Sequence, residues 1–124
     1  MVSVECKDRD CLRFPRIHDV KDETPEIIFL RFTHVIFGVS SSPFLLNATV
    51  NHHMETYRHM DPTFVDKFLS SIYVDDVSLG GDDVDSTFEL YLKSKLRLAE
   101  AGFKLRKFIT NSAELQHQIA ANEH

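Results

Sequence analysis

Between residues 71 and 102 the sequence changes once from a strand-like to a helical pattern, and this change restricts the folds that the chain can adopt. In residues 71–79, β-prone side chains stand on both sides of Asp75-Asp76, which predicts a hairpin with this acidic pair at its tip. After Gly80-Gly81, apolar residues recur at helical spacing on one face: Val84, Phe88, Tyr91, Leu92, Leu96 and Ala99. A hairpin followed by an amphipathic helix predicts an α+β fold, with helices packed on one face of an antiparallel sheet.

Polar residues and a glycine mark the ends of this helix. Ser86 and Glu89 have the spacing of a capping box, and nearby aspartates (Asp82, Asp83 and Asp85) suit the positive end of the helix dipole. Gly102 fits the left-handed position that ends helices. Phe103–Ile109 then reads as a strand, and Glu114–Ala121 as a weak polar helix with a frayed end.

The first half of the chain is less regular. Residues 1–26 are polar and predict loop, with one short strand at Cys11–Phe14. Ile27–Phe37 is rich in β-branched and aromatic residues and predicts a strand or hairpin. Ser42 and Pro43 suit the start of a helix through Arg58, whose apolar face comprises Leu46, Val50, Met54 and Tyr57. Thr63–Leu69 is amphipathic and can extend this helical region.

The composition fits one ordinary globular domain of 124 residues, 43% hydrophobic and 27% charged. The apolar runs are too short to span a bilayer, and the N-terminus lacks the pattern of a signal peptide. Two cysteines, Cys6 and Cys11, are too few for a disulfide framework, and no Cys-x-x-Cys pair supports a zinc site. We therefore expect an intracellular protein, cytoplasmic or nuclear, that does not enter a membrane. The net charge of −5 disfavours tight nucleic-acid binding by this chain alone.

The acidic pair Asp75-Asp76 is the candidate for a metal-binding, catalytic site. Two carboxylates at a hairpin tip can bind Mg²⁺, which takes one or two carboxylates together with substrate phosphates. The alternative is an exposed polar turn, which aspartate favours by itself. The acidic stretch from Asp75 to Asp85 lacks the ligand spacing of an EF-hand loop, and the chain has no repeats of the calcium-binding β-helix kind.

Three blocks of sequence resemble the reverse transcriptases of Pao/BEL-type retrotransposons. Tyr73-Val74-Asp75-Asp76 has the form of the catalytic hairpin of reverse transcriptases. Arg31–Thr49 resembles the segment that precedes this hairpin in the Pao/BEL family, while Glu89–Lys95 and Gly102–Lys107, followed by Asn111-Ser112, resemble its next helix and strand. The resemblance covers roughly Asp8 to Ile119. It implies an irregular segment at 1–26, a partial polymerase palm at 27–112 and a polar tail at 113–124.

The resemblance also implies roles for individual residues. Asp75 and Asp76 are the expected metal-binding and catalytic carboxylates, and Mg²⁺ (or Mn²⁺) is the expected cofactor. Lys107 falls where the family carries a basic residue that can assist departure of pyrophosphate; the alternative is a solvated lysine. Substrate contacts are expected from four further residues: Tyr73, Phe37, Gly38 and Val39. In the intact family the partners are an RNA or DNA template-primer and deoxynucleotides.

This sequence departs from the family at several points. The family's first catalytic aspartate precedes the stretch that aligns with Asp8–Phe14, and no residue here matches it; Glu5 stands in the wrong context. Pro15-Arg16 replaces an apolar-aromatic pair, and Ile36 stands where many relatives have proline. We therefore expect a truncated reverse transcriptase, an RNA-directed DNA polymerase by family, that is inactive alone. The alternative is a degenerate palm fragment that acts as a non-enzymatic binding module or has no function.

Overall fold

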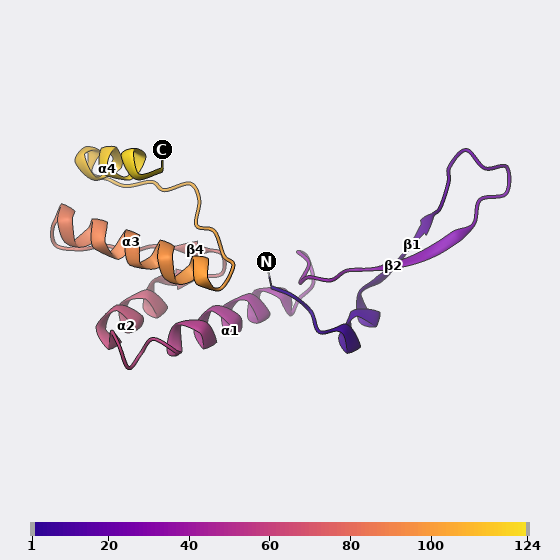
Figure 1. Cartoon of the computed structure of the whole chain (residues 1–124), viewed down its shortest axis with the longest axis horizontal. Helices are drawn as coiled ribbons and strands as arrows, with labels where there is room; N and C mark the ends of the chain where they lie inside the picture. Colours follow the sequence, from indigo (N-terminus) through magenta and orange to yellow (C-terminus); the bar gives the residue numbers. More distant parts are fainter. Residues whose placement is uncertain (1, 124) are drawn as a thin grey trace. The chain divides into compact units, whose positions relative to one another are not determined.

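The structure is a computed structural model that describes residues 2–123, and it separates into two compact units. One unit ends at Leu45 and the other begins at Leu46. Across the described residues there are four α-helices, one 3-10 helix and two separate two-stranded antiparallel sheets (Figure 1). The α+β class and the antiparallel pairing are thus confirmed. The predicted palm range, residues 27–112, runs across the division between the units.

The first unit contains a 3-10 helix, η1 (Cys6–Leu12), and a hairpin of β1 (Arg13–Ile17) with β2 (Ile27–Arg31). The predicted short strand at 11–14 is therefore misplaced, and the strand predicted from Ile27 ends at Arg31 rather than at Phe37. Pro15 lies within β1 and pairs with Phe29. The flanking bonds from Phe32 N to Leu12 O and from His18 N to Glu26 O place Pro15 between hydrogen-bonded pairs. Its missing N–H therefore removes no bond from the ladder.

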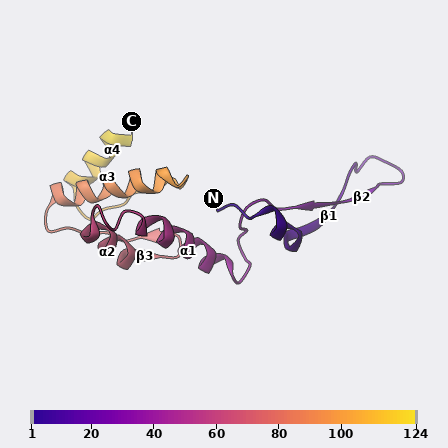
Figure 2. The same ribbon diagram turned by 60° about the horizontal axis from the view of Figure 1, so that its bottom comes forward.

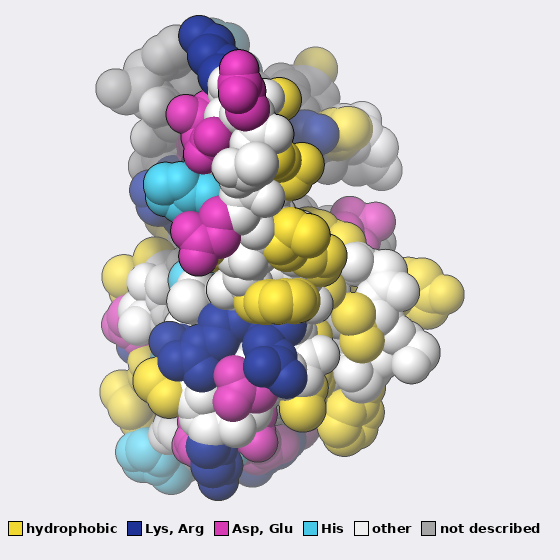
Figure 3. Space-filling model, turned by 90° about the vertical axis from the view of Figure 1, so that its right-hand side faces the viewer, with side chains coloured by type: hydrophobic (Ala, Val, Ile, Leu, Met, Phe, Trp, Pro, Cys, Tyr) yellow, Lys and Arg dark blue, Asp and Glu magenta, His cyan; other side chains and the backbone are white. Residues whose placement is uncertain are grey.

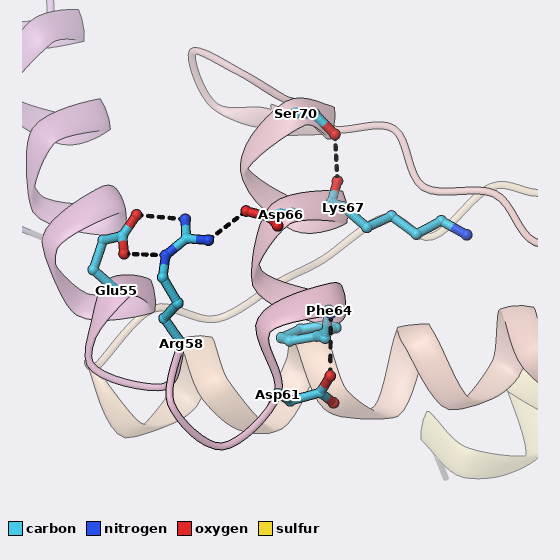
Figure 4. A network of polar contacts seen from close by, with 7 residues as sticks. All are labelled: Glu55, Arg58, Asp61, Phe64, Asp66, Lys67 and Ser70. Atoms are coloured by element: carbon cyan, nitrogen blue, oxygen red, sulfur yellow. Dashed lines mark hydrogen bonds and ion pairs between the residues drawn. The ribbon is translucent and has the colours of Figure 1, made fainter.

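The second unit includes most of helix α1 (Ser42–Glu55), followed by α2 (Pro62–Ser71). Ser42 does not cap α1 but lies within it, and its hydroxyl donates to the Ile36 carbonyl at 2.5 Å. Asp61 caps α2 by accepting from the Phe64 amide, and Arg58 joins Glu55 to Asp66 across the connection (Figure 4). The predicted helix through Arg58 therefore ends at Glu55, and α2 is a separate helix.

Helix α3 (Val84–Glu100) lies between α2 and α4 (Ala113–Glu123) in both ribbon views (Figure 2), and it contributes to two hydrophobic clusters. The first cluster joins α1, α2 and α3 through Val50, Met54, Phe64, Val65, Phe68 and Leu98. The second joins α3 to α4 through Tyr91, Leu115 and Ile119. Because α3 packs on both sides, its buried surface differs from the predicted single stripe: Leu92 and Leu96 are exposed, while Ser94 and Leu98 are buried.

The ends of α3 are set by Asp83 and Gly102. Asp83, rather than Ser86, is the N-cap, and its carboxylate accepts from the Ser86 amide at 2.7 Å. At the other end, Gly102 adopts a φ of 79° while its amide and that of Phe103 donate to Ala99 and Leu98. This confirms Gly102 as the residue that ends the helix, since a left-handed φ strains any residue with a Cβ.

The strand predicted at Phe103–Ile109 is wrong. The segment runs without strand pairing from α3 to α4; three of its apolar side chains still pack inward, whereas Ile109 is exposed. Phe103 and Leu105 pack against the first cluster and Phe108 against the second. The inward contacts hold the segment extended without a neighbouring strand.

Candidate functional site

A short hairpin carries the two candidate carboxylates. β3 (Ile72–Tyr73) pairs with β4 (Asp76–Val77), with Ile72 opposite Val77 and Tyr73 opposite Asp76. The two turn residues are therefore Val74 and Asp75, so the predicted tip at Asp75-Asp76 is one residue too late. Asp75 lies in the turn, whereas Asp76 begins the returning strand.

The hairpin is anchored on one side and strained at its turn. Ile72 and Val77 pack against the first cluster, and the Ser78 amide donates to the Ser71 carbonyl at 2.9 Å. Val74 adopts a φ of 55°, which is a genuine outlier for a β-branched residue. Such strain persists only where the surrounding structure imposes it, and it gathers at functional sites.

The extended segment after α3 contains a second non-glycine residue with positive φ, Lys107, at 60°. Leu105 and Phe108 both pack inward although they are three residues apart. A regular extended chain would place them on opposite sides. Lys107, with its left-handed φ, lies between these two contacts, and the Phe108 ring meets the Tyr91 ring edge-on at 4.7 Å between centroids.

These segments enclose one groove of about 750 Å³ within the second unit. We call it the hairpin groove and define it by its lining from β4 and the adjoining turn, residues 78–84, the inner side of α3 and residues 105–112. Asp75 and Asp76 line it from the hairpin, while Arg106 and Lys107 line it from the extended segment. The structure thus brings the three predicted catalytic residues to one cavity, with acidic and basic groups on different segments.

The remaining predicted substrate contacts do not share this lining. Tyr73 is 80% exposed and does not line the hairpin groove. Phe37, Gly38 and Val39 belong to the first unit, in the turns before α1, and the Phe37 side chain is 90% exposed. Gly38 has a φ of 87°, and no atom lies within 4 Å of the position that a Cβ would take. The backbone angle, rather than a close neighbour, therefore explains why glycine occupies position 38.

The donor set of the groove suits a metal that also takes ligands from a substrate. Among residues 2–123 no three or more His, Cys, Asp or Glu side chains are grouped to hold a metal ion. Asp75 and Asp76 can supply one or two oxygen ligands, which is the number Mg²⁺ often takes from a protein when phosphates complete its shell. Asp83 also lines the groove, but its carboxylate caps α3. Hydrogen bonds from the Ser86 amide and hydroxyl lower the pKa of this carboxyl.

Two groove residues, Arg106 and Asp82, were absent from the sequence-based site. The available signal for Arg106 was its position next to Lys107, as a second basic residue of the same segment. Asp82 follows Gly81, where an added Cβ would come within 2.6 Å of the Thr87 hydroxyl and 2.8 Å of the Ser86 hydroxyl. Close packing at Gly81 therefore fixes this wall of the groove against the start of α3.

Comparison with known proteins gives no relative, since no family model, no curated protein and no solved structure matches this chain. None of the helices in the described part of the chain is both long and apolar enough to cross a membrane.

Proposed function

We propose that residues 27–112 are part of a reverse transcriptase palm of the Pao/BEL type, and that the hairpin groove receives the triphosphate of a deoxynucleotide. The observation that carries this proposal is the shared groove. Asp75-Asp76 and Lys107 belong to separate blocks of the family resemblance, more than 25 residues apart in the chain, and they line one cavity.

Each group has a distinct part in the proposal. Asp75 and Asp76 offer carboxylate oxygens at the groove, and a bound Mg²⁺ would supply neutralisation of the phosphate charge. Lys107 and Arg106, on another segment that lines the groove, offer N–H donors to phosphate oxygens. Charge-assisted hydrogen bonds of this kind are stronger than neutral ones. The strained turns at Val74 and Lys107 hold these groups in place before a ligand arrives.

Nucleotide binding and nucleotide transfer are separate expectations for this chain. Phosphoryl transfer depends almost entirely on positioning and charge neutralisation. By the resemblance, two of the family's three metal-binding aspartates have counterparts here. The 124-residue chain should therefore bind a metal-triphosphate weakly and show no primer extension on an RNA template with Mg²⁺ or Mn²⁺. A non-enzymatic module derived from a palm is the alternative.

Calorimetric titration of the chain with a deoxynucleoside triphosphate, with and without Mn²⁺, tests the proposal. Binding should require Mn²⁺ and should weaken about tenfold or more in Asp75→Asn and in Lys107→Gln, since a lost charged contact costs about 1.5–3 kcal/mol. Asp85→Asn and Lys104→Gln are matched controls, because both residues are exposed and neither lines the groove. Equal binding by Lys107→Gln and Lys104→Gln would refute the proposed site. Mn²⁺-independent binding of a template strand, without triphosphate binding, would support the alternative.

A further inference from the structure

The β1–β2 hairpin exposes apolar side chains that the first unit does not cover. Neither strand contains a fully buried residue. On the face shared by Pro15, Ile17, Ile27 and Phe29, the Ile27 and Phe29 side chains are 62% and 70% exposed. Hydrophobic side chains at the surface beside Lys and Arg are visible in the space-filling view (Figure 3). A two-stranded hairpin is marginal by itself and gains stability from further strands.

The backbone pairing shows which edge of the hairpin can accept another strand. Residues 12 and 32 form one hydrogen-bonded pair, and residues 18 and 26 form another. The alternation of an antiparallel ladder then directs the N–H and C=O groups of residues 27, 29 and 31 outward on β2. The corresponding groups of β1 belong to residues 13, 15 and 17, where Pro15 has no N–H to offer. Proline protects the β1 edge, whereas the β2 edge is open from Ile27 to Arg31; just beyond this stretch the Val4 amide donates to the Thr33 carbonyl.

We propose that β2 pairs edge to edge with β2 of a second copy of this chain, antiparallel and centred on Phe29. This register overlaps all five residues of the strand, from Ile27 to Arg31. It places Phe29 opposite Phe29 of the other copy, and Ile27 opposite Arg31. Because the outward-facing residues 27, 29 and 31 fall at hydrogen-bonded positions, both copies satisfy their free backbone groups.

The charges of the strand suit a symmetric contact of this kind. Arg31 is the only charged residue of β2, and its guanidinium is paired with the Asp10 carboxylate at 3.1 Å. In the proposed register the two Arg31 side chains stand at opposite ends of the contact, so no like charges face each other. The resulting four-stranded sheet gathers Ile17, Ile27 and Phe29 of both copies at the middle of one face, which also carries Arg13 and Arg31, and its outer edges are the two strands that carry Pro15. Addition of further copies therefore stops at two.

Sedimentation velocity over a range of protein concentrations tests the pairing. The natural chain should form a concentration-dependent dimer, and Phe29→Arg, which places two arginines opposite each other, should sediment as a monomer. Val20→Arg is the control, because Val20 is 84% exposed but lies in the loop between the strands. A monomer at every concentration in the natural chain, or a dimer that survives Phe29→Arg, would overturn the proposal.

A second variant keeps the test decisive if Phe29→Arg fails to fold. In a background of Cys6→Ser and Cys11→Ser, Phe29→Cys should form an intermolecular disulfide on mild oxidation, because a directly opposed, hydrogen-bonded pair has Cα atoms about 5.5 Å apart. Val20→Cys in the same background should not cross-link at the same rate. Equal cross-linking of the two variants would mean random collision and would overturn the assigned register.

Discussion

Asp61 connects α2 to α3, two of the three helices that form the first cluster, and its substitution gives the sharpest test of the fold. Its carboxylate accepts from the Phe64 amide at 3.1 Å, which caps α2, and from the Lys93 ammonium of α3 at 3.0 Å. Replacing Asp61 with alanine removes both contacts. Loss of an N-cap costs about 1 kcal/mol, and an ion pair this exposed contributes about 0.5 kcal/mol. The free energy of unfolding should therefore fall by about 1.5 kcal/mol, and Tm by about 6 °C.

Two companion variants separate the contributions. Asp61→Asn retains the cap and loses the charge, so it should cost only about 0.5 kcal/mol, because asparagine caps as well as aspartate. Lys93→Met removes the ion pair alone and should match Asp61→Asn. Urea unfolding followed by circular dichroism measures all three. Asp61→Asn that destabilises as strongly as Asp61→Ala would refute the assigned cap.

The difference in unfolding free energy between the natural chain and Asp61→Asn depends on pH with a definite sign. The Lys93 ammonium, followed by the Phe64 amide, lowers the pKa of the Asp61 carboxyl below its usual value. A lowered pKa in the folded state contributes stability that is fully present above the unfolded-state pKa, about 3.9 for aspartate. The contribution is lost as pH falls through the lower, folded-state pKa. The natural chain and Asp61→Asn should therefore differ at pH 6 and converge in acid; a difference that grows in acid would contradict this.

Three further predictions concern the core and the hairpin groove. Gly81→Ala should cost about 1 kcal/mol in unfolding free energy, because its Cβ would displace hydroxyls at 2.6 and 2.8 Å. The Cβ of Gly80→Ala meets open space, so this variant should be neutral when both are compared by thermal unfolding. Phe68→Ala, at a fully buried position, should cost about 3–5 kcal/mol by urea unfolding, and a smaller loss than Gly81→Ala would show that the first cluster is not the core. Mn²⁺ at tens to a hundred times its dissociation constant should stabilise the natural chain by about 1–3 kcal/mol relative to monovalent salt of matched ionic strength. The double variant Asp75→Asn/Asp76→Asn should lose this gain, and equal responses would mean an ordinary solvated turn.

The helical elements could be predicted from sequence because their signals are local. The apolar residues Val50 and Met54 follow the period of a helix, and both are buried in α1. Gly102 ends α3 because the backbone angle there favours glycine in any context. The choice of Asp83 over Ser86 as N-cap could not be settled, since several polar residues in a row can each serve.

Strand pairing could not be predicted with the same success because it depends on distant segments. Phe103 and Leu105 alternate as in a strand, but alternation reveals only that two faces differ, not that another strand lies alongside. Pro15 is unfavourable in most strands, and only the register shows that its missing N–H faces outward from β1. Likewise, Leu92 and Leu96 fit a helical stripe, but α3 packs on two sides and neither residue faces a neighbour closely enough to be buried.

The residues of the candidate site were proposed from the sequence, but their arrangement could not be. Asp75, Asp76 and Lys107 were selected through the resemblance to reverse transcriptases, and the groove that unites them depends on the course of the chain after α3. The turn shifted by one residue because Ile72 and Val77 both pack against the first cluster and therefore face each other. Arg106 became visible as a groove residue only when both inward neighbours had been placed.

Paramagnetic broadening by Mn²⁺ in amide NMR spectra tests the central claim, a metal site at the hairpin groove, most directly. At Mn²⁺ concentrations well below that of the protein, signals of residues 74–77 should broaden first, together with those of residues 105–108, which also line the groove. Asp75→Asn/Asp76→Asn should abolish this selective loss, while Asp85→Asn should preserve it. The account would be contradicted if the amide signals of residues with other exposed carboxylates (Asp66, Asp85 and Glu114) broadened as strongly as those of the hairpin.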